Sequence, residues 1–271
     1  MVKKKDKDME DLPHLTKDGE GEKKKAFVDV TSTESDLTGI LGAFEVFLRK
    51  FKGAAFVCAI VPAAIAYLIA LSVSLTPGYL ITTSMYQVTN EYHGLLHAFL
   101  MAFSLVLSYG TYGLVLILVV PFLNKLMPIK MKNWRGNWYS VQTIPWYYHN
   151  ALVQLVRYTI LDFITPTPLN IMFYRMMGMK IGKGCVINTS NISDPCMIEL
   201  EDYVTIGGSA TIFGHYAQGG FLVLASVKIK RGATVGLKAS IMGDVVVGEK
   251  VTVKPHTILL PKTRLNKGDP Q

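Results

Sequence analysis

The sequence predicts a mixed fold in which two transmembrane helices are followed by a left-handed parallel β-helix, so that membrane α-helix and all-β solenoid share one chain. Three observations lead to this prediction. Aliphatic residues recur every six positions in the last third of the chain, two long apolar runs without charge precede that repeat, and Lys and Arg flank the runs but are absent between them. Half of the 271 residues are hydrophobic and the mean hydropathy is +0.30, which is high for a soluble chain of this length.

The six-residue repeat is the strongest of the three signals. Its positions are Ile229, Val235, Ile241, Val247, Val253 and Leu259, and the residues two places earlier are Val227, Ala233, Ala239, Val245, Val251 and Thr257, all small or β-branched. Helices repeat every ~3.6 residues and simple strands every ~2, so neither gives this spacing. In a triangular solenoid with six residues per face, every sixth side chain points to the axis. We therefore expect a β-helix over residues 179–263 with a tail at 264–271, and the upstream repeats at Ile181, Ile187, Ile198, Val204 and Ala210 belong to it.

The two apolar runs, residues 54–75 and 95–123, are each long enough to cross a bilayer, which needs ~20 apolar residues in a helix. Basic residues lie before the first run and after the second: Arg49, Lys50, Lys52, Lys125, Lys130, Lys132 and Arg135. The connecting loop expected at 76–94 has none. By the positive-inside rule, we expect a multi-pass membrane protein with both termini and the β-helix in the cytoplasm.

The remaining segments predict polar or interfacial structure. Residues 1–38 are polar and of mixed charge, as in disordered segments, and residues 39–52 form an amphipathic stripe that predicts an interfacial helix leading into a transmembrane hairpin at 39–133. Residues 134–178 predict an aromatic interfacial segment and amphipathic helices. The Trp and Tyr residues at 134–148 suit the lipid headgroup level; a packed aromatic cluster is the alternative. The helix at 150–163 is expected to lie on the bilayer.

Charge and composition exclude some functions. The net charge is +8, but no basic recognition helix accompanies it, so we expect no nucleic-acid partner; anionic lipid accounts for the basic residues at the membrane edge. The three cysteines lack metal-like spacing. A three-histidine metal site is not expected either, because only His215 and His256 follow residue 150.

The repeat is interrupted where chemistry is expected. Ala210 and Ile229 are nineteen residues apart rather than eighteen, and the glycine-rich stretch 213–226 predicts a protruding loop that carries His215. A histidine accepts a proton near neutral pH, although an ordinary exposed loop histidine is the plain alternative. Its tautomer needs a hydrogen-bond acceptor, for which the candidates are Asn191, Asp194 and Glu199. For Asp194, a turn-forming role before Pro195 is an equally good interpretation.

Two groups of segments resemble known families. The segments Ser226-Val227-Lys228-Ile229, Ala233-Thr234-Val235-Gly236-Leu237-Lys238-Ala239 and Thr257-Ile258-Leu259-Leu260-Pro261-Lys262 resemble the sugar O-acetyltransferase branch of the hexapeptide-repeat acyltransferases. The segments 188–195, 198–202 and 210–215 are similar to the membrane-embedded C-terminal region of epsilon-polylysine synthetase-like peptide synthetases. Residues 216–220, which follow the histidine, depart from that second pattern, and the chain carries no adenylation or carrier domain, so an activated acyl group is expected to come from outside.

The resemblance implies a function and a set of residues. It implies a homotrimer that transfers an acetyl or aminoacyl group to a hydroxyl or amine near the membrane, with His215 as general base assisted by Asn191 or Asp194. It implies no tightly bound cofactor but acyl-CoA, or an acyl-phosphopantetheine carrier protein, as thioester co-substrate. The donor would meet Ser226, Lys238, Ala239, Lys254 and Lys262. A non-catalytic trimeric scaffold that binds a partner on its solenoid is the alternative.

Overall fold

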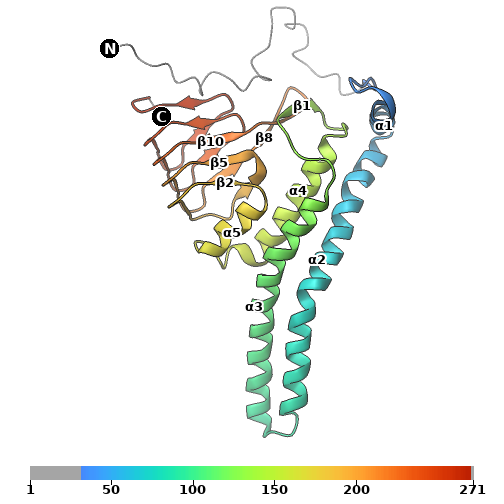
Figure 1. Cartoon of the computed structure of the whole chain (residues 1–271), viewed down its shortest axis with the longest axis vertical. Helices are drawn as coiled ribbons and strands as arrows, with labels where there is room; N and C mark the ends of the chain where they lie inside the picture. The colour runs from blue at the N-terminus through green and yellow to red at the C-terminus, as the bar shows by residue number, and fades with distance from the viewer. Residues whose placement is uncertain (1–31, 270–271) are drawn as a thin grey trace, which may run out of the picture.

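A long helical hairpin precedes the solenoid in the computed structural model, which describes residues 32–269. Helix α1 (Gly39–Lys50) leads into α2 (Lys52–Thr89), and α3 (Gly94–Leu126) runs back along α2 (Figure 1). Both long helices have the length and apolar composition needed to cross a membrane. The expected interfacial helix therefore corresponds to α1, whereas most of the predicted polar N-terminus lies outside the described residues.

The hairpin corrects one prediction, because residues 76–89 are not a loop but continue α2 down to a turn at 90–93. Two residues of this stretch, Gly78 and Thr82, contact α3. Ser108 donates a hydrogen bond to the carbonyl of Gly78 at 2.8 Å, and its hydroxyl lies 3.0 Å from that of Thr82. Small residues at such a contact let two apolar helices approach closely, so a weakly hydrophobic sequence still forms a helix here.

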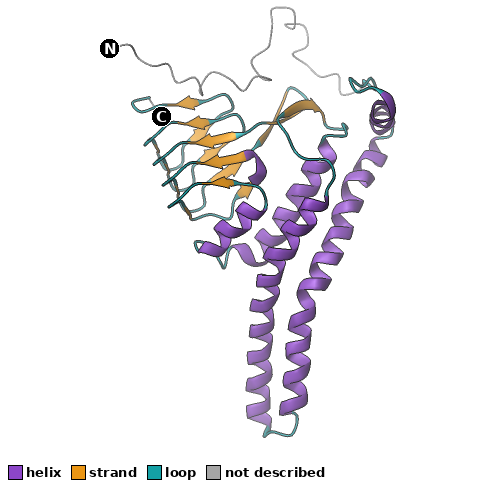
Figure 2. Cartoon of the chain, viewed as in Figure 1, coloured by secondary structure: helices purple, strands orange, loops and turns teal. Residues whose placement is uncertain are grey.

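The C-terminal part is a three-sided parallel β-helix (Figure 2). Its strands are β2 (Lys180–Ile181), β3 (Val186–Ile187), β4 (Ile192–Ser193), β5 (Ile198–Leu200), β6 (Thr205–Ile206), β7 (Thr211–Phe213), β10 (Val227–Ile229), β11 (Thr234–Val235), β12 (Ser240–Ile241), β13 (Val246–Val247), β14 (Thr252–Val253), β15 (Ile258–Leu259) and β16 (Arg264–Leu265). They form sheets in the orders β16-β13-β10-β5-β2, β14-β11-β6-β3 and β15-β12-β7-β4.

The strand register confirms the six-residue repeat. Ile229 pairs with Val247, and Val247 pairs with Leu265, so one coil takes 18 residues (247 − 229 = 18). The repeat side chains fill the interior: Ile229, Val235 and Ile241 are fully buried. Leu265 is buried at the same interior position, and the solenoid therefore continues past residue 263, where the prediction placed a tail.

The interruption is longer than the sequence count suggested. Ile212 pairs with Ile241, which is 29 residues later, so the insertion adds 11 residues to the 18 of a regular coil rather than one. It is a β-hairpin, β8 (His215–Gln218) and β9 (Phe221–Leu224), instead of an irregular loop. Strand β1 (Trp134–Asn137), which lies between α3 and the next helix in the chain, adds to β9 as a third antiparallel strand.

The segment between hairpin and solenoid packs inside the protein. Helix α4 (Thr143–Val156) and a π-helical turn (Arg157–Leu161) bury the apolar stripe that we expected to lie on a bilayer, because it meets α2, α3 and the solenoid core. Of the three tryptophans, Trp134 and Trp146 pack against Leu222 and Leu224 of the β-hairpin, which favours the aromatic-cluster alternative. Helix α5 (Pro168–Met176) then contacts α3 and β2, so one hydrophobic core runs from the helices into the solenoid.

Candidate active site

His215 is the first residue of the inserted hairpin and faces a buried carboxylate. Its Nδ1 atom lies 2.5 Å from Oδ2 of Asp194, whose side chain is fully buried, whereas the His215 side chain is 28% exposed. A carboxylate only accepts hydrogen bonds, so Nδ1 of His215 carries the proton and donates a hydrogen bond to Asp194. The opposite nitrogen, Nε2, is thereby left with its lone pair free to accept a proton.

Three donors hold the Asp194 carboxylate in place. Besides His215, the backbone N–H of Gly214 donates to Oδ2 at 3.1 Å and the Asn150 side chain donates to Oδ1 at 2.5 Å. The backbone of Asp194 is left-handed, with φ of 56°, just before a short 3₁₀ turn (Pro195–Met197); Asp tolerates this conformation better than most residues. The turn that the sequence predicted therefore exists, and it also aims the carboxylate at His215.

Gly214 has a steric reason to be glycine. A Cβ atom at this position would lie 2.6 Å from Cβ of Met197 and 3.3 Å from Cβ of Asp194. Any side chain here would push the 3₁₀ turn away from the hairpin. The glycine thus permits the close contact that joins Asp194 to its partners.

A pocket of about 570 Å³ opens beside His215. Its lining residues come from three parts of the chain: Tyr67, Trp146, Tyr147, Asn150, Ala151, Gln154, Ser193, Phe213 and His215. The rings of Trp146 and Phe213 lie with centroids 5.2 and 5.5 Å from that of His215, and the polar groups of Asn150, Gln154 and Ser193 share the same space. This combination of apolar walls and a few polar groups is typical of small-molecule sites.

The other two candidate partners of the histidine have different contacts. The side-chain oxygen of Asn191 accepts a hydrogen bond from Arg157 of the π-helical turn. Glu199 forms ion pairs with Lys180 at 3.3 Å and Lys228 at 3.5 Å on the solenoid surface. Of the three acceptors suggested by the sequence, the structure brings Asp194 to His215.

The residues expected to bind a thioester donor occupy several places on the solenoid. Ser226 closes the inserted hairpin, where its N–H and hydroxyl both donate to Asn133. Lys262 lies on the same edge of the prism as His215, because its N–H bonds to Asp244, next to Gly243, whose Cα faces the His215 backbone.

Lys238 and Lys254 follow other strands and lie on a different edge of the prism, next to Gly208 and Gly236 respectively. Ala239 is fully buried, and its N–H and C=O both make backbone hydrogen bonds within the solenoid. Within a single chain, therefore, Lys262 shares the histidine's edge whereas Lys238 and Lys254 do not.

Two titratable groups next to the pair are held uncharged. Burial lowers the pKa of His149 from 6.5 to about 4, although the charge of Asp194 opposes this, and its Nδ1 lies 2.9 Å from Oδ1 of Asn124. Burial, assisted by Asp194, raises the pKa of the Cys196 thiol to about 12.

No group of three or more His, Cys, Asp or Glu residues within 32–269 is arranged to hold a metal ion.

Sequence reasoning missed the contribution of α4. Asn150 and Trp146 are one helical turn apart on α4, and the Asn150 side chain also donates to the Trp146 carbonyl at 3.1 Å. The available signal was an amide placed among the apolar positions of an amphipathic segment. Asn133, which binds Ser226, had no signal in the sequence.

Comparison with known proteins gives distant similarities. No family model matches the chain. Over 103 residues the chain is 28% identical to a delta-poly-L-ornithine synthetase of Acinetobacter baumannii (strain AB307-0294), and the aligned part is 38% of this chain but 8% of that synthetase. The match is in line with the expected similarity to poly-amino-acid synthetases, of which this chain spans a small fraction.

Among solved structures, a crystal structure of serine acetyltransferase from Neisseria gonorrhoeae aligns with 69% of this chain and 86% of that chain, with 14% sequence identity and a TM-score of 0.29. The parallel β-helix of this chain is established by the pairing of its own strands and does not depend on that comparison.

Proposed function

We propose that the protein is a membrane-anchored acyltransferase that moves an acetyl or aminoacyl group from a CoA or phosphopantetheine thioester to a hydroxyl or amine. The observation that carries the proposal is the His215–Asp194 pair, 2.5 Å apart at the wall of a pocket of about 570 Å³. A histidine whose Nδ1 is fixed by a buried carboxylate can act as a general base through its second nitrogen.

The reaction follows from this geometry. Nε2 of His215 takes the proton of the acceptor hydroxyl or amine while that oxygen or nitrogen attacks the thioester carbonyl carbon. The tetrahedral intermediate collapses with cleavage of the C–S bond, and the imidazolium returns the proton to the departing thiolate. Asp194 stabilises the imidazolium between these steps because its buried negative charge lies against the protonated ring. A backbone N–H at a solenoid turn is the proposed donor to the oxyanion.

The donor is proposed to lie along the solenoid, with Ser226 and Lys262 on the histidine's side. Lys238 and Lys254 lie on another edge of the prism, so they would contribute from a neighbouring copy of the chain. This placement favours the homotrimer implied by the family resemblance. Ala239, buried in the interior, would act only by shaping the turn beside it.

Membrane attachment is proposed through α2 and α3. Lys50, Lys52 and Lys125 lie at the end of the hairpin that joins the solenoid, and the turn at 90–93 lies at the other end (Figure 1). By the positive-inside rule, the solenoid and the chain on both sides of the hairpin lie in the cytoplasm, where CoA and carrier thioesters are made available.

Substitution of the base tests the proposal against the scaffold alternative. The full chain in nanodiscs would be given acetyl-CoA with a panel of alkyl alcohols, sugars and amines, and release of free thiol would be followed. We expect His215→Ala to lower turnover by about 10²–10⁴-fold, the usual contribution of a general base. The matched control is His256→Asn, because His256 lies on a solenoid turn with φ of 60° that Asn tolerates. Thiol release unchanged in His215→Ala would contradict the catalytic role.

A further inference from the structure

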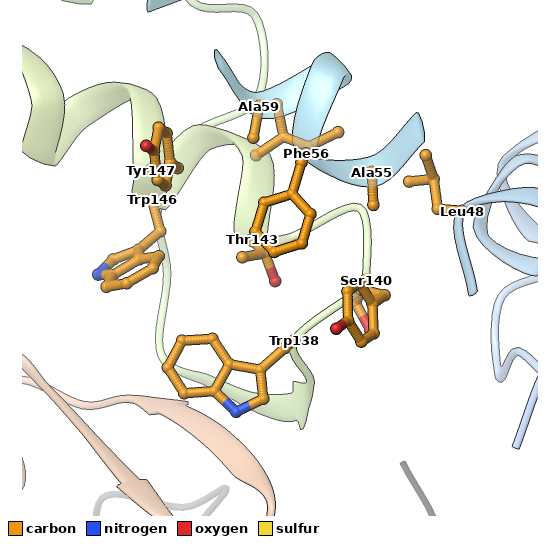
Figure 3. A pocket seen from close by; sticks show the side chains of 11 residues that line it. Leu48, Ala55, Phe56, Ala59, Trp138, Ser140, Thr143, Trp146 and Tyr147 are labelled. Atoms are coloured by element: carbon orange, nitrogen blue, oxygen red, sulfur yellow. The ribbon is translucent and has the colours of Figure 1, made fainter. Parts of the chain in front are cut away.

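A second pocket is lined almost entirely by apolar side chains (Figure 3), and it shares two lining residues with the His215 pocket. It measures about 350 Å³ and lies between the α1–α2 junction and the segment 138–147. Phe56 of α2 reaches toward Thr143, and Trp138 and Trp146 stand opposite it (Figure 3). Its volume falls within the ~300–1,000 Å³ range of small-molecule pockets, and its walls offer little beyond apolar contact.

The two pockets meet at Trp146 and Tyr147, which line both. A row of rings connects the apolar space with the base: the centroid of Trp138 lies 6.0 Å from that of Trp146, which lies 5.2 Å from that of His215. A molecule with a polar head at His215 therefore has an apolar cavity directly beside it, and Trp146 and Tyr147 belong to the lining of both spaces.

The apolar pocket also borders the surface that faces lipid in the proposed function. Phe56 and Ile60 of α2 are 56% and 46% exposed, and the exposed apolar face of α2 begins at the pocket. The opposite wall is fixed by a buried contact, because Glu45 of α1 accepts the N–H of Val141 at 3.2 Å and also bonds Arg49. A hydrocarbon chain can thus enter from the side of the helix into a preformed cavity.

We propose that the acceptor is a lipid with a single hydrocarbon chain; this rests on the proposed function. Its polar head would react at His215, and its hydrocarbon chain would occupy the pocket between the α1–α2 junction and residues 138–147. The chain is assigned to the acceptor rather than to the donor for a positional reason. All residues expected to bind the thioester belong to the solenoid, and none of them lines either pocket.

Binding of a brominated monoacylglycerol tests the assignment independently of turnover, because bromine quenches tryptophan fluorescence on contact. The probe would be titrated into full-length Trp134→Phe protein in nanodiscs, which leaves Trp138 and Trp146 as reporters, and unlabelled monoacylglycerols of increasing chain length would compete with it. We expect quenching, and competition that improves about fourfold for each added methylene, expressed against the free aqueous concentration of the competitor, until the pocket is full.

The variants separate this pocket from general contact with lipid. Ala55→Phe fills the pocket and is expected to weaken binding at least ~10-fold, the loss of two or more methylene contacts. Ala64→Phe adds the same ring to an exposed position of the same helix and should leave binding unchanged. Phe56→Ala, at an exposed position that tolerates truncation, enlarges the pocket and should shift the best competitor to a longer chain.

The outcomes decide between occupants. Quenching that is equal in Ala55→Phe and Ala64→Phe, together with an unchanged chain-length optimum in Phe56→Ala, would show general contact with lipid and overturn the proposal. Quenching by a brominated acyl-CoA but not by the monoacylglycerol would assign the chain to the donor and also overturn it. The titration measures binding without turnover, so its result stands even if no acyl transfer is found.

Discussion

Replacing Asp194 with Asn tests the proposed site most sharply, because it removes a charge and keeps the shape. Both carboxylate oxygens accept hydrogen bonds: Oδ2 from Gly214 and His215, and Oδ1 from Asn150. The new amide group would place N–H opposite one of these donors. The Gly214 N–H is fixed in the backbone, so the carbonyl oxygen of the introduced amide should stay on the Oδ2 side and its NH₂ should face Asn150.

The expected magnitude follows from the lost charge. In this arrangement His215 keeps its tautomer but loses the negative charge that stabilises its protonated form during the reaction. Two unit charges about 4 Å apart at an effective dielectric constant of ~20 interact by about 4 kcal/mol. Divided by the ~1.36 kcal/mol that corresponds to tenfold in rate, this predicts a fall in kcat of about 10³-fold.

The assay compares kcat and KM for thiol release with thermal unfolding of the same proteins. Asp194→Asn should lower kcat with little change in KM for the thioester, and it should also lower Tm because Asn150 loses its acceptor. A kcat within threefold of wild type for Asp194→Asn would refute the assignment of Asp194.

Three further predictions concern the surroundings of the site. The pKa of His149 is about 4 in the folded protein against 6.5 for a free histidine, so the unfolded chain binds the extra proton more readily. The contribution of His149 to stability should be complete above pH 6.5 and fall by up to about 3 kcal/mol toward pH 4. Denaturant unfolding would measure this pH dependence, and His149→Gln should abolish it. With its pKa raised to about 12, Cys196 should resist iodoacetamide at pH 8 in the folded protein and react after unfolding; equal rates in both states would contradict its burial. Glu45→Gln should cost about 2 kcal/mol by weakening charged hydrogen bonds to Arg49 and Val141, and a Tm equal to wild type would argue against this tie.

The solenoid could be predicted because its interior imposes a repeat. Each interior position, such as Ile229, must carry a side chain that fits between the coils above and below. This requirement restricts the residue type at every sixth position of the sequence. The pairing of His215 with Asp194 was within reach for the same reason, since both are extra residues next to strands of one face, β7 and β4. The prediction left Asn191 and Glu199 equally open because side-chain direction at an irregular turn has no period.

The contacts between helices and solenoid could not be predicted. Asn150 reaches Asp194 across 44 positions of sequence, and nothing periodic links an amphipathic helix to a particular corner of a β-helix. The sequence also understates the length of the inserted hairpin, because Ala210 and Ile229 are both interior side chains and the count between them happens to lie near one full coil. Residues 76–89 carry several polar side chains, yet they remain helical because Thr76 and Thr83 bond carbonyls of their own helix and Thr82 meets Ser108 of α3.

Strand β1 connects the helical hairpin directly to the candidate site. It leaves the end of α3, joins the hairpin that begins with His215, and continues into the helix that supplies Asn150. A fragment starting at residue 179 would therefore lack part of the candidate site: β9 would have an unpaired edge, Leu222 and Leu224 would lose their contacts with Trp134 and Trp146, and one oxygen of Asp194 would have no donor. The solenoid alone does not hold the complete surroundings of His215 and Asp194, because β1 and α4 supply the rest.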